Sequence, residues 1–195
     1  MTLGDLVFLL MFLSSFGAAI GAAVAAARRR RARAGTIIRR LAVALGVYFA
    51  VVIAVALTSS QRFVPLGYEQ CSDDWCIAAD SVHRDTTSGA VTYTIGFRLS
   101  SRARRVAQRE RFVVAYARTG DGRRIDALPD GAAVPFDTLL EAEQAIRTTR
   151  RFVIPLPARD VGLVVAREGG FRFPGCCIIG DENSIFHKHT VVRLD

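Results

Sequence analysis

The sequence predicts two N-terminal transmembrane α-helices followed by an all-β, antiparallel sandwich domain. Two long stretches without a charged residue, residues 6–27 and 41–60, predict the helices. A run of arginines between them predicts which side of the membrane each end faces. After residue 60 the chain changes to short apolar segments separated by turns rich in glycine, aspartate and proline, which predict strands.

Each uncharged stretch is long enough to cross a bilayer. The first runs from Leu6 to Ala27 (22 residues) and the second from Leu41 to Ser60 (20 residues). A helix of about 20 apolar residues spans a hydrocarbon core of roughly 30 Å. A cleaved signal peptide is the rival interpretation of the first stretch, because its end is rich in alanine. Signal peptides carry positive charge before the apolar stretch, whereas here only Asp5 precedes it and arginines follow it.

The segment between the two stretches, residues 28–40, predicts the topology. It holds no acidic residue and seven arginines: Arg28, Arg29, Arg30, Arg31, Arg33, Arg39 and Arg40. Short loops rich in arginine stay in the cytoplasm, where they meet anionic lipid headgroups. The N-terminus and everything after Ser60 are therefore expected on the periplasmic side of a bacterial inner membrane.

The charge balance of the exported part argues against nucleic acid as a partner. Of the formal net charge of +8, the seven arginines and Asp5 account for +6, which leaves +2 for residues 61–195. Nucleic-acid binding depends on concentrated positive charge facing phosphates. Here that charge is concentrated in the cytoplasmic loop, so no nucleic-acid partner is expected.

The first stretch contains a glycine pair suited to helix packing. Gly17 and Gly21 form a GxxxG arrangement, which lets two helix backbones approach closely in lipid. The sequence leaves open whether this pair packs against the second helix or against another membrane protein. Neither stretch contains an ionisable residue, so the helices are expected to anchor and dock, with no ion pathway and no cofactor.

Residues 61–67 are expected to be a linker, and residues 68–195 a single β domain. Val91–Leu99 alternates apolar and polar residues with the period of a half-buried strand. Leu139–Ala145 suits a short helical turn or a loop. Further strands are expected at Cys76–Val82, Phe112–Tyr116, Arg123–Leu128, Ile146–Ile154, Val161–Ala166 and Thr190–Leu194. About seven short strands favour an antiparallel sandwich, with a partly open barrel as the alternative.

All four cysteines fall in the exported part, where disulfides form. A local Cys71–Cys76 bridge is the preferred pairing. Either of these residues joined to Cys176 or Cys177 is the competing pairing, and the sequence does not decide between them. The spacing matches no familiar zinc site.

The segment order of this domain is similar to that of a known group of proteins. Val91–Leu99, Phe112–Ala117 and the run from Leu139 to Val165 resemble the immunoglobulin-like (Ig-like), telokin-type sandwich domains attached to bacterial lipoproteins and membrane anchors. Phe152-Val153-Ile154-Pro155 fits their F-x-V/I-P step, whereas Glu141-Ala142-Glu143 stands where a Pro-Gly-Glu turn is expected. The resemblance covers roughly residues 68–195. It implies an Ig-like fold but no activity.

The Cys71–Cys76 segment contains candidate partner-binding residues. Asp73, Asp74 and Trp75 lie between the two cysteines, and tryptophan is enriched at interface hot spots. A tryptophan buried in the core of the sandwich is the alternative interpretation. The sequence therefore predicts either a binding tip or an ordinary core residue here.

A polar cluster near the C-terminus contains candidate metal ligands. Asp181, His187 and His189 offer a carboxylate and two imidazoles, and Glu182 and Asn183 lie beside them. A solvated loop before the final strand is the alternative interpretation, because no regular element fixes the spacing of these ligands.

The motifs of hydrolases and phosphate-binding enzymes are absent from the sequence. We therefore expect a non-catalytic, membrane-anchored accessory or scaffolding subunit of a larger envelope complex, in contact with lipid and with other integral membrane proteins. A tethered ligand- or metal-binding domain is the alternative.

Overall fold

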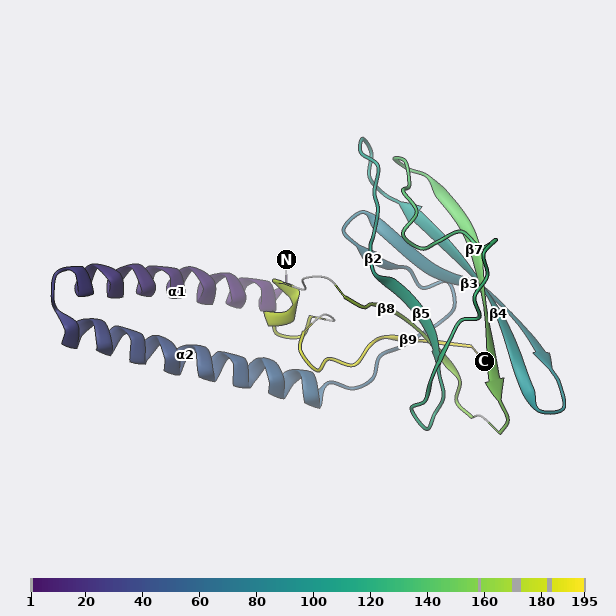
Figure 1. Ribbon diagram of the computed structural model, residues 1–195, viewed down its shortest axis with the longest axis horizontal. Helices are drawn as coiled ribbons and strands as arrows, with labels where there is room; N and C mark the ends of the chain where they lie inside the picture. Colours follow the sequence, from purple (N-terminus) through teal and green to yellow (C-terminus); the bar gives the residue numbers. More distant parts are fainter. Residues whose placement is uncertain (1, 158, 170–172, 182–183, 195) are drawn as a thin grey trace. The chain divides into compact units, whose positions relative to one another are not determined.

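The computed structural model describes residues 2–157, 159–169, 173–181 and 184–194 (Figure 1). The chain forms two compact units. The first comprises Met1–Ser60 and Phe171–Lys188, and the second comprises Gln61–Gly170 and His189–Asp195. Within the β domain expected over residues 68–195, the described residues 173–181 and 184–188 group with the helices.

Two apolar helices form most of the first unit. Helix α1 (Leu3–Ala27) begins with a capping box, in which Thr2 Oγ1 accepts a hydrogen bond from Asp5 N and Asp5 Oδ2 accepts one from Thr2 N. Helix α2 (Arg31–Thr58) follows after a short turn. The hairpin packs through small and apolar residues, and the buried ones are Ala22, Ala25, Ala34, Tyr48, Val52 and Ala56.

The arginine-rich segment differs from the expected loop. Only Arg28, Arg29 and Arg30 lie between the helices, and the other four arginines belong to α2, which begins at Arg31. Arginine and alanine are both good helix formers, so the helix continues into the charged sequence.

The second unit is a β-sandwich of two sheets. One sheet has the strand order β1 (Phe63–Val64), β9 (Val191–Arg193), β8 (Gly162–Arg167), β5 (Val113–Arg118) and β6 (Arg124–Asp126). The other has the order β2 (Gln70–Ser72), β3 (Trp75–Thr86), β4 (Ala90–Ser101) and β7 (Ala145–Pro155). The short 3₁₀ helix η1 (Gly175–Cys177) belongs to the first unit.

All seven expected strands are present, and the β-sandwich is confirmed. The five-stranded sheet is mixed, because β1 pairs with β9 in parallel, which corrects the expectation of purely antiparallel sheets. Strand β1 also lies within the expected linker, and its Val64 is buried in the core. A strand of two residues is too short to show an alternating pattern in the sequence. Leu139–Gln144 is a loop, and Ala145 is the first residue of β7.

The core lies between the two sheets. The four-stranded sheet contributes large side chains such as Ile95, Phe97 and Phe152, and the five-stranded sheet contributes Leu163 and Val192. Strand β4 alternates strictly between buried and half-buried residues from Val91 to Ser101. One side of the four-stranded sheet therefore faces the core and the other faces outward.

Candidate interaction surface

The four-stranded sheet presents a polar side away from the core. The register places Arg98 of β4 opposite Arg147 of β7, and Thr94 opposite Arg151. Arg147 and Arg151 are exposed. We call this side the polar face and define it by Ser81, His83, Thr92, Thr94, Gly96, Arg98, Arg147, Thr149 and Arg151.

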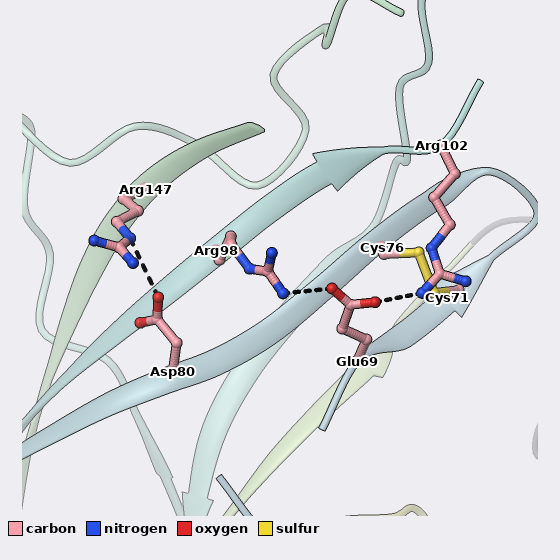
Figure 2. Close-up of polar contacts among 7 residues, drawn as sticks. All are labelled: Glu69, Cys71, Cys76, Asp80, Arg98, Arg102 and Arg147. Carbon is pink, nitrogen blue, oxygen red and sulfur yellow. Dashed lines mark hydrogen bonds and ion pairs between the residues drawn. A yellow bond between two sulfur atoms is a disulfide. The ribbon is translucent and has the colours of Figure 1, made fainter. Parts of the chain in front are cut away.

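One carboxylate receives two guanidinium groups at the edge of the polar face. Arg98 Nη2 lies 2.5 Å from Glu69 Oε1, and Arg102 Nη2 binds the other carboxylate oxygen of Glu69 (Figure 2). Exposed ion pairs each stabilise a fold by only about 0–1 kcal/mol. The exposed Asp73 and Asp74 lie in the adjoining hairpin turn, and Arg102 N donates a hydrogen bond of 2.7 Å to the carbonyl oxygen of Asp74, so this edge carries charges of both signs.

A second ion pair crosses strand β4. Strand β3 has a bulge between Ala79 and Ser81. Asp80 in this bulge forms an ion pair with Arg147, and the distance from Asp80 Oδ2 to Arg147 Nε is 3.2 Å (Figure 2). Strand β4 lies between β3 and β7, so the pair spans it. The β4 residue opposite Ser81 is Gly96, where an added Cβ would lie 2.2 Å from Ser81 Oγ. A Cβ at Gly96 would therefore force the Ser81 hydroxyl into another rotamer at this close approach of β3 and β4.

A disulfide fixes the hairpin beside these ion pairs. Cys71 of β2 and Cys76 of β3 are directly paired and joined, with a Cα–Cα distance of 4.0 Å (Figure 2). This is the pairing preferred from the sequence. Cys176 and Cys177 are free thiols in the first unit, with their sulfurs 3.1 Å apart.

The hairpin turn resolves the two interpretations of its aromatic residue. Trp75 is only 3% exposed and belongs to the core, so it is wrong as a partner-binding residue. Its neighbours Asp73 and Asp74 are exposed. Strand β3 begins at Trp75, and its pairing with Ser101 of β4 places the ring on the side facing the core.

Among the described residues, the predicted metal ligands do not form a three-ligand cluster. Among the described residues, potential metal ligands gather within 4.8 Å at Glu69, Cys71 and Cys76, and the two sulfurs there are bonded to each other. Asp181 and His187 belong to the first unit and His189 to the second. Glu182 and Asn183 lie outside the described residues.

A pocket of about 500 Å³ opens on the five-stranded sheet. Its polar lining includes Arg118, Asp160, Arg193 and Gln61, and the side-chain oxygen of Gln61 accepts a hydrogen bond of 3.2 Å from Arg118. Phe63 contributes an aromatic wall, with the Arg193 guanidinium 5.4 Å from its ring centre. The pocket is large enough for a small anionic molecule.

The two glycines of the GxxxG pair have different surroundings. A Cβ at Gly21 would just touch Ile37 of α2 at 4.0 Å, whereas a Cβ at Gly17 would have no atom within 4 Å among the described residues. The hairpin therefore does not use Gly17 for close packing of its own helices.

Neither a protein-family model nor a curated protein matches the chain. Solved structures with some likeness to it exist. An uncharacterized β-sandwich protein of Clostridium difficile is 10% identical, with 70% of this chain and 96% of that chain covered and a TM-score of 0.44. The yjhA protein of Bacillus subtilis is 11% identical, with 67% and 98% covered and a TM-score of 0.43.

A third likeness is to MPT63, a secreted protein of Mycobacterium tuberculosis. It is 13% identical, with 58% of this chain and 94% of that chain covered and a TM-score of 0.40. Likenesses at this level carry no function to this chain.

Glu69, Asp80 and Arg98 were not predicted as site residues from the sequence. Arg98 carried a signal, because it stands at an outward position of an alternating strand. Glu69 and Asp80 carried no such signal, because their arginine partners are distant in the sequence. Those partners lie in β4, just after β4 and in β7.

Proposed function

We propose that this chain is a membrane-anchored accessory or scaffolding subunit. In this proposal α1 and α2 cross a bacterial inner membrane, and the β-sandwich is an Ig-like domain on the periplasmic side. The helices dock against other integral membrane proteins, and the sandwich contacts the exposed loops of a larger envelope complex, such as a respiratory, photosynthetic or transport assembly. The chain itself is non-catalytic.

The exposure of the two helices carries the proposal. They have 25 and 28 residues, long enough to cross a bilayer, yet large apolar side chains stay uncovered along both. Phe16 of α1 is 63% exposed, and Val47 of α2 is 61% exposed. Helices from the core of a soluble protein bury such side chains. Lipid is the environment that covers them here without further protein.

The arginines support the orientation. All seven lie in the turn between the helices or in the first three turns of α2. Positively charged residues beside a short turn favour a cytoplasmic location, which places both outer helix ends and the sandwich on the far side.

Two surfaces support docking. In lipid, the open space beside Gly17 permits close approach by a helix of another protein. On the sandwich, the arginines and threonines of the polar face offer positive charge and hydroxyl groups to an acidic loop. The two-sheet architecture supports the Ig-like assignment.

Purification from native membranes tests the proposal. The full chain, tagged at its C-terminus, is extracted in mild detergent, and co-purifying proteins are quantified by mass spectrometry. Stoichiometric recovery with one defined membrane complex is expected. Gly17→Leu is expected to reduce this recovery, whereas Gly46→Leu, at another glycine with open space around it, is the matched control. Recovery of the chain alone contradicts the proposal.

Binding of a small ligand is the second candidate function, and the pocket beside Arg118 and Arg193 favours it. Titration calorimetry of the full chain with inorganic phosphate and with citrate tests this candidate. Binding that disappears in Arg118→Ala supports it. For a metal, the corresponding test is Zn²⁺ binding that is lost in the His187→Ala, His189→Ala double variant.

A further inference from the structure

An apolar loop packs along both helices within the first unit. We call residues 173–181 and 184–188 the apolar loop. It carries no charged residue from Phe173 to Gly180. Its first described residue, Phe173, stacks edge-on against Phe8 with ring centres 5.7 Å apart and also contacts Phe12 at 6.4 Å.

The contacts lie well inside the ends of the helices. Phe8 and Phe12 lie five and nine residues after Leu3, the first residue of α1. Tyr48 of α2 donates a hydrogen bond of 2.6 Å to the carbonyl oxygen of Cys177, and it lies ten residues before Thr58, the last residue of α2. Ten helical residues span about 15 Å. The side chains that hold the loop therefore start from the depth of the second and third turns of the helices.

The backbones of the loop and α1 also approach closely. At Gly4, in the first turn of α1, an added Cβ would lie only 2.4 Å from the carbonyl oxygen of Ile179. At the other end of the loop, Lys188 Nζ donates a hydrogen bond of 3.0 Å to the carbonyl oxygen of Ser59, just after α2. The loop thus follows the outer turns of both helices, and its one lysine lies at the level where α2 ends.

Several backbone hydrogen bonds close turns within the loop, which lowers the number of unpaired polar groups that it carries at membrane depth. Cys177 N donates to Pro174 O at 2.9 Å, Ser184 N to Asp181 O at 3.0 Å and His187 N to Ser184 O at 3.1 Å. Pro174 has no amide hydrogen to satisfy. The Tyr48 hydroxyl and the Cys177 carbonyl are hydrogen-bonded to each other. This pairing avoids the free-energy cost of a buried hydroxyl without an acceptor.

The loop nevertheless leaves large apolar side chains uncovered. Phe186 is 65% exposed, Phe173 44% and Ile185 41%. These side chains and the exposed apolar side chains of α1, such as Leu3 and Leu6, are all part of the first unit. A surface that continues the lipid-facing side of a transmembrane hairpin has acyl chains as its natural cover.

We propose that the apolar loop is a third membrane-contacting element of this chain, whose Phe173, Ile185 and Phe186 side chains enter the periplasmic leaflet beside α1 and α2. This inference rests on the proposed membrane crossing of the two helices. The loop widens the anchor at the periplasmic surface, and His189 and Thr190 follow it directly in the chain and lead into β9.

Site-directed spin labelling tests the inference in the full chain. Cys176→Ser and Cys177→Ser remove the free thiols, and single cysteines are then placed at Phe186, Ile185, Leu10 and Ser88. Leu10 is exposed on α1 and Ser88 lies in the exposed β3–β4 turn. The protein is reconstituted in nanodiscs of phosphatidylcholine and phosphatidylglycerol. Collision rates are measured with oxygen, which concentrates in lipid, and with a water-soluble nickel chelate.

The ratio of oxygen to nickel collisions is expected to be several-fold higher at positions 185, 186 and 10 than at position 88. A water-like ratio at 185 and 186 with a lipid-like ratio at 10 overturns the inference and leaves the membrane crossing intact. Water-like ratios at all four positions overturn both. Protection of 185 and 186 from both reagents means that protein covers the loop, which also overturns the inference.

A measurement on the unsubstituted chain guards against damage by the cysteine changes. Cys176 and Cys177 are alkylated in the same nanodiscs by a membrane-permeant maleimide and by a sulfonated, impermeant one. The permeant reagent is expected to react several-fold faster. Equal rates with both reagents contradict the inference.

Discussion

Tyr48 donates a hydrogen bond of 2.6 Å to the carbonyl oxygen of Cys177, which lies 129 residues later in the sequence. This contact joins the second apolar helix to the apolar loop within one compact unit. It gives a polar side chain of an apolar helix its partner, and it is one of the contacts that tie residues 173–181 and 184–188 to the helices.

Removal of this hydroxyl is expected to loosen the loop. A typical hydrogen bond contributes about 0.5–1.5 kcal/mol, so Tyr48→Phe should speed amide hydrogen exchange in residues 173–181 and 184–188 by up to about tenfold. Tyr68→Phe is the matched control, because its hydroxyl accepts a hydrogen bond from Arg62 within the sandwich. Unchanged exchange in Tyr48→Phe would show that the contact does not hold the loop.

Substitution by alanine should change the alkylation rate of Cys176 and Cys177 at Gly4 but not at Gly17. Gly4→Ala places a Cβ against the backbone oxygen of Ile179, so it should displace the loop and increase the alkylation rate of Cys176 and Cys177. Gly17→Ala meets open space and should leave that rate unchanged, while its helix gains about 0.5–1 kcal/mol. Equal alkylation rates in the two variants would contradict the packing of the loop against α1.

The disulfide pairing has a direct readout in mass. Alkylation of the denatured, unreduced chain should add two groups, at Cys176 and Cys177, and alkylation after reduction should add four. Burial raises the pKa of the Cys177 thiol to about 11, so in the folded protein this residue should alkylate slowly at neutral pH and faster as pH rises. Peptides that link residues 71 or 76 to 176 or 177 would indicate the competing pairing.

A side chain at position 96 should lower the stability of the sandwich, because its Cβ would meet the hydroxyl of Ser81. Gly96→Ala is expected to destabilise the sandwich by about 1–3 kcal/mol through its contact with Ser81 Oγ, and Ser81→Ala should recover much of that loss. Fluorescence of Trp75, the only tryptophan and a core residue of the sandwich, reports unfolding in urea. Additive effects of the two substitutions would show that the close approach of β3 and β4 is absent.

The sequence predicted the elements that have strong local patterns. Residues 91–99 alternate strictly and became the central part of β4, and the uncharged stretches became α1 and the main part of α2. Trp75 was ambiguous, since only the pairing of β3 with β4 determines that its ring faces the core. Strand β1 and the apolar loop were missed because long-range contacts, such as Phe63 with Val191 and Tyr48 with Cys177, create them.

The candidate surface was harder to predict for the same reason. Asp73 and Asp74 were chosen because they neighbour a tryptophan, yet the paired charges lie at Glu69, Arg98 and Arg102. Their proximity depends on the sheet order β2-β3-β4-β7, which no local pattern contains.

In the proposed topology, the hairpin spans the membrane and the sandwich lies outside the cytoplasm. Cysteine accessibility in right-side-out membrane vesicles tests it most directly, with single cysteines at Ser88 in the sandwich and at Arg29 in the turn between the helices. An impermeant maleimide should label position 88 in intact vesicles, and position 29 only after the vesicles are opened. Labelling of position 29 with protection of position 88 would invert the topology, and extraction of the chain by carbonate would contradict membrane anchoring itself.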